Sequence, residues 1–574
     1  MGGSSQETEW IVKEIPDGFR GEDAVGGLPR ILRLLLAQRG YSEPEKIERF
    51  LRPRLGDLAD PFELPDMDVA VERIFTAIDA GEAICIFGDY DVDGITSITI
   101  LRQALRLYGA EPRAFIPIRG TEGYGLSELA LERCLTEAAR PSLMIAVDCG
   151  TASREQIAKL QADGIDVIVA DHHEPGEAGR PPGVAVVNPK LGDDFGYLCS
   201  AGVVFKLVHA LLKTRKVEGA DPRELLKETL DLVAVGTIAD IVPLVDENRL
   251  LVRHGLRRLP ESKNHGLQAL MKVTGMNGRA TSSDVGFRIG PRINAAGRMD
   301  MPGDGLAVLL AESPAEAATR AEQLDDYNRR RQKCELQMFE EAMAQLVEHH
   351  DPENDAAIVV GSRNWHPGVV GIVASRLMRA YYKPSFVVAI DDEGLGKGSG
   401  RSIEGVSLVN AIDAGRELLV AGGGHHMAAG ISIMEDQMDA FRDRFRKFVM
   451  ESTSADERQP KLHIDAEVPF GDLSLEFLES YELLQPFGAS NPQPVFLARD
   501  VWLTERPRRL KNKHLKLFLR QGVVEHDAMF FGAGDRELPD PPWDLAFTID
   551  RNVFRGRTSL QMTVREVREV RASG

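Results

Sequence analysis

The chain has 574 residues, 43% of them hydrophobic, and a formal net charge of −19, so it is long enough for three or four domains that each bury a core. This charge argues against a protein that coats nucleic acid or membranes through bulk positive charge, although it allows a local basic groove. Five scattered cysteines without a CxxC spacing argue against a disulfide framework or a cysteine zinc site, and they are typical of the reducing cytoplasm. We find neither an apolar signal core at the N-terminus nor a run of about 18 apolar residues, so we expect no membrane span.

Residues 1–67 are expected to form an N-terminal preface of helix and loop that carries no chemistry. An apolar-rich helix is predicted over 31–37, and prolines punctuate the sequence that follows it. From residue 68 to about 275, short apolar runs alternate with helical segments, which predicts βαβ units and a parallel sheet. We therefore expect an α/β domain over 68–312.

An apolar strand over 83–87 leads into three aspartates at alternate positions, Asp89, Asp91 and Asp93. Aspartate is a poor strand former, so three of them directly after a strand need an explanation. If the chain stays extended, alternate side chains face the same way and the three carboxylates converge. Their mutual repulsion would then favour bound cations, whereas the alternative interpretation is an ordinary polar turn.

Two further predicted strands and one apolar stretch end on residues of the same kind: Asp148, Asp171, His172, His173 and Asp240. In a parallel sheet the carboxyl ends of the strands meet at one edge, where ligands bind. Carboxylates and imidazoles without thiolates suit Mn²⁺ or Mg²⁺. Two such ions about 3.5–4 Å apart can activate water and stabilise the leaving oxygen of a phosphoester. The domain has no GxxxxGK[ST] or GxGxxG loop, which argues against a nucleotide-driven motor or a dehydrogenase.

These motifs resemble those of the DHH phosphoesterase family: Asp91-x-Asp93-Gly94, Asp148-x-Gly150, Asp171-His172-His173 and Asp240. Three further stretches, 115–126, 200–203 and above all 291–298, resemble the RecJ single-strand DNA exonucleases within that family. The resemblance extends from about residue 70 to the C-terminus and is weak in the preface. It implies a multidomain α/β protein with a parallel-sheet DHH catalytic domain (68–312), a long connecting helix (313–350), a DHH-associated substrate-binding α/β domain (351–455) and a C-terminal OB-fold-like β-barrel (456–574).

The resemblance also implies two groups of ion ligands. One ion would be held by Asp93, Asp148, His172 and Asp240, and the second by Asp89, Asp91 and the shared Asp148. His173 would orient a ligand or contact the scissile phosphate. Smaller hydrolases of the family have a histidine four residues before the first aspartate of the pair, where this chain has Phe87. We therefore expect Asp89 to serve the second ion, in the weaker of the two sites.

The segment 291–298 contains Arg292, Asn294 and Arg298. Guanidinium groups bind phosphate through two hydrogen bonds, so we interpret these three residues as donors to the substrate. The alternative is a tight glycine-rich loop with solvated arginines.

A capping serine, Ser313, followed by Pro314 predicts the start of one long amphipathic helix that ends at about residue 350. Its three consecutive arginines, 329–331, form either a solvated face or one flank of a DNA groove. After this helix, a second α/β unit is predicted over 355–450.

Two glycine-rich segments of the second unit, 396–402 and 422–426, are predicted to be loops that offer backbone N–H groups to phosphate. The resemblance implies that Ser399 and Arg401, together with Arg119 of the first domain, hold a 5′-terminal phosphate. It also places His425 opposite the metal ions, whereas the alternative is a histidine packed in a glycine turn.

The last part of the chain is rich in short β-segments, which indicates a small barrel, most simply an OB-fold. The stretch 506–520 carries seven Lys or Arg residues and no acidic residue. Such a local reversal of charge is typical of a nucleic-acid groove, although a solvated hairpin is the alternative. Four aromatic side chains could stack on bases or belong to the core: Trp502, Phe518, Phe530 and Phe531.

Together these features predict a metal-dependent exonuclease that hydrolyses phosphodiester bonds of single-stranded DNA with two ions. The resemblance adds a 5′-to-3′ polarity, a role in DNA repair and recombination, a monomeric cytoplasmic enzyme, and a RecQ-type helicase and a single-strand-binding protein as partners. One alternative is a phosphodiesterase for short oligonucleotides or cyclic dinucleotides, whose relatives are shorter and lack the barrel. Another is a non-catalytic single-strand DNA-binding scaffold, against which the complete set of ligand positions argues.

Overall fold

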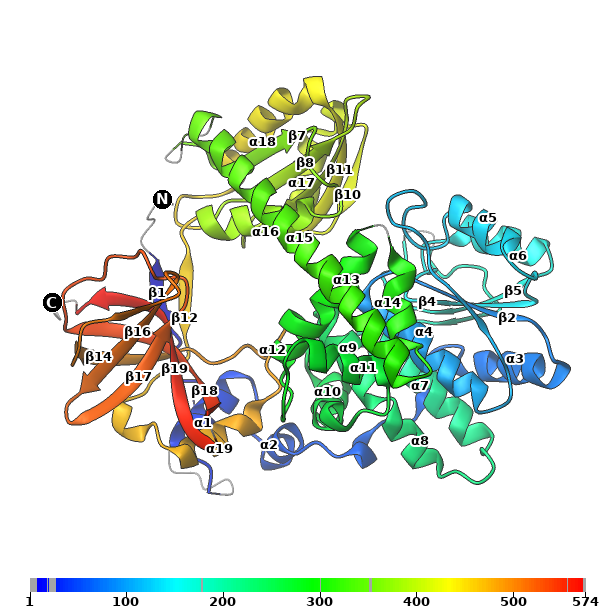
Figure 1. Cartoon of the computed structure of the whole chain (residues 1–574), viewed down its shortest axis with the longest axis horizontal. Helices are drawn as coiled ribbons and strands as arrows, with labels where there is room; N and C mark the ends of the chain where they lie inside the picture. The colour runs from blue at the N-terminus through cyan, green and yellow to red at the C-terminus, as the bar shows by residue number, and fades with distance from the viewer. Residues whose placement is uncertain are drawn as a thin grey trace. The chain divides into compact units, whose positions relative to one another are not determined.

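The computed structural model describes residues 8–17, 19, 27–176, 179–299, 301–349, 351, 354–554 and 556–570. Two compact units are distinguished, one that contains Leu58–Pro460 and one that combines Thr8–Asp57 with Lys461–Gly574 (Figure 1). The N-terminal residues 1–7, in which we expect no secretion signal, lie outside the described residues. Among the residues described, no helix is both long and apolar enough to cross a membrane.

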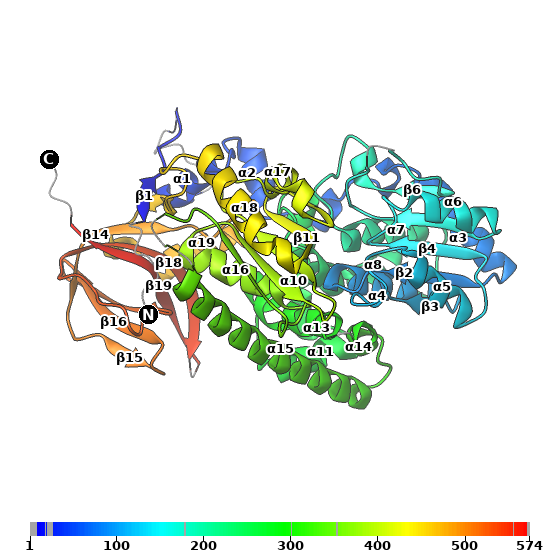
Figure 2. The same ribbon diagram turned by 90° about the horizontal axis from the view of Figure 1, so that it is seen from above.

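The first unit begins with a parallel sheet of five strands in the order β3-β2-β4-β5-β6 (Figures 1 and 2). The strands are β2 (Ile84–Gly88), β3 (Arg113–Phe115), β4 (Leu143–Val147), β5 (Asp166–Ala170) and β6 (Ala185–Val187). Helices α5 (Glu128–Thr136) and α6 (Arg154–Ala162) pack on one face, and α3 (Met67–Ala80), α4 (Val92–Arg106) and α7 (Ser200–Thr214) on the other. The strands are almost entirely apolar because both faces of the sheet are covered.

The aspartate cluster does not stay extended, so the condition under which the three carboxylates would share one face of a strand is not met. Helix α4 begins at Val92, and the Asp91 side chain caps it by accepting from the backbone N–H groups of Asp93 (2.9 Å) and Gly94 (3.1 Å). Aspartate is among the best residues for this capping position because it satisfies N–H groups that have no partner within the helix. The three carboxylates therefore come from a strand end, a cap and the first helical turn.

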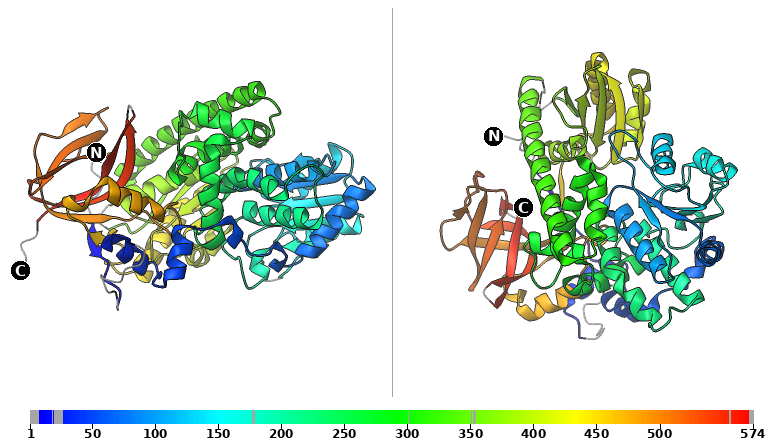
Figure 3. Two further views of the ribbon diagram at one scale, coloured as in Figure 1. Left: turned by 90° about the horizontal axis from the view of Figure 1, so that it is seen from below. Right: turned by 45° about the vertical axis from the view of Figure 1, so that its right-hand side comes forward.

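A group of helices continues the first unit: α8 (Pro222–Glu228), α9 (Leu230–Ala239), α10 (Asp246–Arg258), α11 (His265–Val273), α12 (Ser282–Asp284), α13 (Gly290–Arg298) and α14 (Pro302–Leu309). The segment 291–298 is therefore helical and is not a glycine-rich loop. The predicted long helix is confirmed as α15 (Pro314–His349), which runs from these helices to a second sheet (Figure 3).

That second sheet has the order β10-β11-β9-β8-β7, with β7 and β8 parallel and the other pairs antiparallel. Its elements are β7 (Ile358–Ser362), α16 (Val370–Tyr381), β8 (Ser385–Ile390), β9 (Leu395–Arg401), α17 (Leu408–Ala414), β10 (Ala421–Gly424), β11 (Ala428–Met434) and α18 (Met438–Ser452). The predicted loops at 396–402 and 422–426 are thus mostly strand. Close packing explains the glycines, since a Cβ at Gly400 would lie 2.4 Å from the Phe386 ring.

The second unit confirms the predicted barrel. Seven strands follow the order β13-β14-β18-β19-β17-β16-β15, and an additional pairing of β14 with β16 closes the sheet on itself. The strands and the helix that accompanies them are β13 (Ala466–Glu467), α19 (Leu475–Tyr481), β14 (Phe496–Leu503), β15 (Arg508–Leu510), β16 (His514–Gln521), β17 (Val524–Phe530), β18 (Trp543–Phe554) and β19 (Arg557–Glu569).

The N-terminal segment packs on this barrel, whereas the sequence suggested a separate preface over 1–67. Strand β1 (Glu9–Val12) pairs in parallel with β12 (Lys461–Ile464). Helices α1 (Arg30–Gln38) and α2 (Pro44–Leu51) bury Leu35 and Phe50 in the same core as Phe496 of the barrel. The apolar faces of these two helices explain why residues 8–57 join the C-terminal unit.

Candidate metal centre

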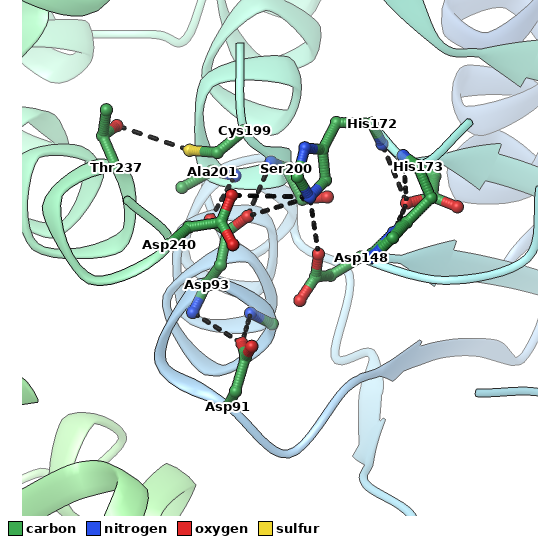
Figure 4. Close-up of polar contacts among 12 residues, drawn as sticks. Asp91, Asp93, Asp148, His172, His173, Cys199, Ser200, Ala201, Thr237 and Asp240 are labelled. Atoms are coloured by element: carbon green, nitrogen blue, oxygen red, sulfur yellow. Dashed lines mark hydrogen bonds and ion pairs between the residues drawn. The ribbon is translucent and has the colours of Figure 1, made fainter. Parts of the chain in front are cut away.

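The predicted ligands meet at the carboxyl edge of the first sheet (Figure 4). Asp89 directly follows β2, Asp148 directly follows β4, and Asp171, His172 and His173 follow β5. Asp91 and Asp93 enter from the start of α4, and Asp240 follows the last residue of α9. Elements far apart in the sequence thus deliver their side chains to one place.

His172 lies at the centre of the cluster. Its Nε2 atom is 3.5 Å from Oδ1 of Asp148, 3.6 Å from Oδ2 of Asp240 and 3.9 Å from Oδ2 of Asp93. Three overlapping groups in the described part of the chain have atoms close enough to share a metal ion: Asp93 with His172 and Asp240, Asp148 with His172 and His173, and Asp89 with Asp91 and Asp148. The structure therefore brings all six predicted ligands together and gives Asp148 and His172 a place in two groups each.

Asp93 is fixed by the start of α7. Its carboxylate accepts the backbone N–H groups of Ser200 (2.7 Å) and Ala201 (2.8 Å), an arrangement in which the positive end of a helix stabilises a negative charge. Gly236 of α9 passes closely, since a Cβ there would lie 3.0 Å from Oδ1 of Asp93. The thiol of Cys199 donates to Thr237 at 3.4 Å, which links the start of α7 to α9 (Figure 4).

Asp148 has a positive φ of 59°, which is uncommon for any residue with a side chain. Its carbonyl accepts a hydrogen bond of 3.0 Å from the hydroxyl of Tyr124. Gly150, two residues on, has a φ of 111°. This turn lets the chain leave β4 sharply, so that the buried carboxylate of Asp148 stays within the cluster.

The carboxyl groups are held where negative charge is unfavourable. Burial, and then repulsion from neighbouring carboxylates, raises the pKa of Asp89, Asp93 and Asp148 well above the usual value. Burial and Asp91 raise the pKa of Asp240 to about 6. Oδ1 of Asp89 and Oδ2 of Asp240 are buried without a hydrogen-bond donor in the described structure. A set of buried carboxylate oxygens and a neutral imidazole fits a divalent cation such as Mn²⁺ or Mg²⁺.

The two histidines differ in charge. Burial, and then the positive charge of His173, lowers the pKa of His172 to about 4, so its imidazole is neutral and suited to a metal. For His173 burial acts in the same direction, but the hydrogen bond from Nδ1 to Asp171 (2.7 Å) outweighs it and raises the pKa to about 9. His173 is therefore positively charged at neutral pH, and its Nε2 lies 3.1 Å from the hydroxyl of Tyr124.

Next to the cluster, arginines from four parts of the first unit come together. Burial, followed by the charges of Arg119, Arg331 and Arg401, lowers the pKa of Arg298 to about 10. Burial and Arg119 likewise lower the pKa of Arg401, whose Nη1 donates to Oγ of Ser399 at 2.9 Å. Positive charges that repel one another in this way favour an anion at the same place.

The remaining predicted substrate-binding residues differ in their surroundings. Nε of Arg292 donates to Asp325 of α15 at 2.9 Å, so this guanidinium already has an acidic partner. Asn294 is half-buried and lies one helical turn before Arg298 on the same face of α13. His425 is exposed in the turn after β10, and none of the three ligand groups found among the described residues includes it.

Sequence reasoning gave no role to several residues of the site. Asp171, which charges His173, was named in the Asp171-His172-His173 motif but was given no part in the site. Ser200 and Ala201 act through backbone N–H groups, which leave no signature except small residues at a helix start. Tyr124 lies between two glycines of positive φ, a pattern that indicates a shaped loop.

Comparisons with known proteins agree with this arrangement. The chain matches the DHH family, N-terminal domain, over residues 83–237, the DHHA1 domain over 354–451 and the RecJ OB domain over 464–566. It is 36% identical to "Single-stranded-DNA-specific exonuclease RecJ" of Bacillus subtilis, with 93% of this chain and 67% of the relative aligned. The protein of the same name from Escherichia coli is 34% identical, with 94% and 96% aligned.

Among solved structures, RecJ from Thermus thermophilus in complex with Mn²⁺ has a TM-score of 0.83 and 32% identity over 98% of this chain and 80% of that chain. Its complex with Mg²⁺ has a TM-score of 0.77 and 31% identity over 98% and 79%. Both crystals hold a cation of the kind that the carboxylate cluster suits. With three matched domains and relatives aligned over nearly the whole length, this chain belongs to the RecJ family, whose curated members are named single-stranded-DNA-specific exonucleases.

Proposed function

We propose that this protein is a single-strand-DNA-specific exonuclease that hydrolyses phosphodiester bonds with two Mn²⁺ or Mg²⁺ ions. The observation that carries the proposal is the position of the overlapping ligand groups beside the arginines at 119, 298 and 401. A hydrolytic centre that adjoins a phosphate-binding site suits the removal of nucleotides from a strand end. Three relatives at 34–36% identity carry the name of this activity.

We assign Asp93, Asp148, His172 and Asp240 to one ion and Asp89, Asp91 and Asp148 to the other, with Asp148 shared. Divalent ions in such a site lower the pKa of water and neutralise charge on a phosphoryl group. His173 stays protonated through Asp171, so it adds a positive charge beside the ligand groups that would favour binding of the scissile phosphate. Catalysis by position and charge of this kind requires no covalent intermediate with the chain.

The strand end is proposed to lie on Arg119, Ser399 and Arg401, which would bind a 5′-terminal phosphate and so set a 5′-to-3′ direction. Arg298 and Asn294 would bind the phosphates that follow along the strand. Arg292 donates to Asp325 and would have to leave this partner before it could bind phosphate. His425 would close the site from the second sheet.

The barrel is proposed to guide single-stranded DNA. Trp502 (44% exposed) and Phe531 (54% exposed) are available to stack on bases, whereas Phe530 belongs to the core. Arg508 lies 4.6 Å and Lys516 5.0 Å from the centre of the Phe518 ring, so basic and aromatic groups alternate on this surface. In the cell we place the enzyme in the cytoplasm, as a monomer that acts in DNA repair and recombination with a RecQ-type helicase and a single-strand-binding protein.

One set of substrates tests the proposal: end-labelled single-stranded DNA, duplex DNA and dinucleotides, each with Mn²⁺, with the wild type and Asp148→Ala compared. We expect loss of the single strand from its 5′ end, little cutting of duplex, and no activity for the variant. Hydrolysis of dinucleotides alone would instead favour an oligonucleotide phosphodiesterase, and binding without hydrolysis would favour a scaffold. Arg401→Ala should abolish the preference for a 5′-phosphate, and a preference that survives would refute the assignment of the strand end.

A further inference from the structure

The loop of residues 116–126, between β3 and α5, delivers two groups to the site. The guanidinium of Arg119 lies over the Tyr90 ring, 5.4 Å from its centre, beside Arg298 and Arg401. The hydroxyl of Tyr124 donates to the carbonyl of Asp148 at 3.0 Å and lies 3.1 Å from Nε2 of His173. The conformation of this one loop therefore affects both the proposed phosphate-binding arginine and the charged histidine.

Regular structure does little to hold this loop. It contains neither helix nor strand, and Gly123 and Gly125 have φ values of 88° and 63°. Within the loop, the N–H groups of Thr121 (3.3 Å) and Glu122 (2.8 Å) both donate to the carbonyl of Ile118. Flexible glycines and a single local turn leave the position of Arg119 to side-chain contacts.

Beside the contacts of Arg119 and Tyr124, one ion pair holds the loop backbone. The carboxylate of Glu122 accepts the backbone N–H of Ile118 at 2.7 Å and a hydrogen bond from Nη2 of Arg133 at 3.0 Å. Arg133, on α5, also donates from Nη2 to the carbonyl of Ile116 at 2.8 Å and lies 4.2 Å from the centre of the Phe115 ring. The pair therefore fastens the loop backbone on both sides of Pro117 to a rigid helix.

The pair is more than a surface contact. Only 9% of the Glu122 side chain is exposed, and Arg133 is 28% exposed. Burial alone would raise the pKa of Glu122, but the hydrogen bonds from Arg133 and Ile118 outweigh it and lower the pKa, so the carboxylate is charged. Replacement of either residue would leave the other without its partner, at a substantial cost in folding free energy.

We propose that Glu122 and Arg133 are positioning residues for the exonuclease reaction, which set Arg119 for recognition of the 5′-phosphate and Tyr124 for contact with His173. Neither residue touches the substrate, and both act through the backbone of the loop at Ile116 and Ile118. The inference rests on the proposed function, since it assigns this loop to the same strand end. It adds a pair that lies on the helix behind the loop and takes no part in the ligand cluster.

The test measures kcat/KM on otherwise identical oligonucleotides with a 5′-phosphate or a 5′-hydroxyl. The ratio compared is kcat/KM with the 5′-phosphate divided by kcat/KM with the 5′-hydroxyl. Glu122→Gln should lower this ratio at least 5-fold, because a shift of about 1 Å in a binding group lowers the rate by up to roughly 10²-fold. The matched control is Glu137→Gln, which removes an exposed partner of the same arginine, 3.2 Å away, without touching the loop. This control should leave the ratio unchanged.

A double-mutant comparison identifies the route of the effect. If Glu122 acts through Arg119, Glu122→Gln should not change the ratio further in an Arg119→Ala background. An equal fall in both backgrounds would overturn the proposal, as would an unchanged ratio in folded Glu122→Gln. Arg133→Lys keeps the positive charge but loses the planar arrangement of guanidinium donors, so it should give an intermediate ratio. This variant replaces Glu122→Gln in the test if Glu122→Gln fails to fold.

A second measurement is independent of activity. Hydrogen exchange of the amides in 116–126 should speed up at least 10-fold in Glu122→Gln and stay unchanged in Glu137→Gln, since Ile118 donates directly to Glu122. If wild-type protein shows no preference for a 5′-phosphate, the proposed binding of the strand end fails. Unchanged exchange in Glu122→Gln would overturn the positioning pair itself, so the two failures are distinguishable.

Discussion

Replacement of Gly236 by alanine should disturb the metal centre without altering any ligand. Gly236 lies on α9, four residues before Asp240, where that helix crosses the start of α4. A Cβ at this position would lie 2.5 Å from Oγ1 of Thr96, 2.8 Å from Cβ of Ala201 and 3.0 Å from Oδ1 of Asp93. Since ordinary contact begins at 3.4 Å, α9 must move away by roughly 1 Å.

This displacement has two consequences of known size. Overpacking of a close helix contact costs about 1–3 kcal/mol of folding free energy. The movement also separates Asp240 from Asp93, which share His172 in one ligand group. Misplacement by about 1 Å at a reactive centre costs on the order of 10²-fold in rate. We therefore expect weaker Mn²⁺ binding and a roughly 100-fold lower kcat from a protein that still folds.

Calorimetric titration with Mn²⁺ and single-turnover hydrolysis of a labelled single strand measure the two effects. Gly286→Ala is the matched control, because the nearest atom to its new Cβ would be a methyl of Ile238 at 3.9 Å. Thr96→Ala removes the closest obstacle and should restore part of the activity of Gly236→Ala. If Gly236→Ala binds Mn²⁺ within about 3-fold of wild type, the close approach of α9 does not set the ligand geometry.

Three other predictions follow from the same structure. The pKa of Asp240 is raised to about 6, so the folded, metal-free protein retains a proton that the unfolded chain loses near pH 4. The Tm of the protein in a chelator should therefore fall as the pH rises from about 4 to 6. In thermal melts, Asp240→Asn should reduce this dependence of Tm on pH, and saturating Mn²⁺ should abolish it. Asp171→Asn removes the group that raises the pKa of His173 to about 9. In a plot of kcat against pH, the pH above which kcat falls should therefore shift from about 9 toward about 6.5. A fall that stays near about pH 9 would show that catalysis does not need the charge of His173. A fragment of residues 58–460 should still hydrolyse short oligonucleotides with Mn²⁺ but bind long single strands more weakly and with a smaller salt dependence than the full chain, and equal loss of both activities would assign the barrel a structural role.

The parts of the site that sequence alone predicts are those encoded locally. Asp89, Asp148 and the segment 171–173 directly follow short apolar runs, and the rule that parallel strands present their carboxyl ends at one edge brings them together. The capping role of Asp91 was missed because Asp91 is equally consistent with a turn and with a helix cap. Only contacts with later elements, such as the N–H of Ser200 on Asp93, distinguish the two.

Glycine misled the prediction for the second sheet. Alternating Gly396, Gly398 and Gly400 indicated a loop, because glycine weakens strands through its conformational freedom. In the structure these glycines leave room for large side chains on neighbouring strands, such as the Phe386 ring opposite Gly400. A strand of this kind is specified by its neighbours, so its own residues carry no alternation of apolar and polar side chains that would predict a strand.

The N-terminal segment shows the same limit at longer range. Trp10 pairs with Leu462 across most of the chain, and the guanidinium of Arg568 lies 4.3 Å from the centre of the Trp10 ring. The amphipathic pattern of α1 predicts a buried face but gives no information about the surface that covers it. Deletion of 461–574 alone would therefore expose the apolar residues of α1 and α2, which is why the fragment above begins at residue 58.

The departure at Phe87 follows from the geometry of β2. Side chains of a strand alternate between faces, so Phe87 lies on the face covered by α5 and α6, where its ring stacks 5.0 Å from that of Phe115. The guanidinium of Arg133 packs over the Phe115 ring, so the pair of aromatic rings also contacts the helix whose Arg133 binds the 116–126 loop. A carboxylate two residues beyond Phe87, at the very end of the strand, escapes this core and reaches Asp91 and Asp148. The chain thus uses position 87 for packing and leaves Asp89, whose Oδ1 is buried without a hydrogen-bond donor among the described residues, as the proposed ligand of the second ion.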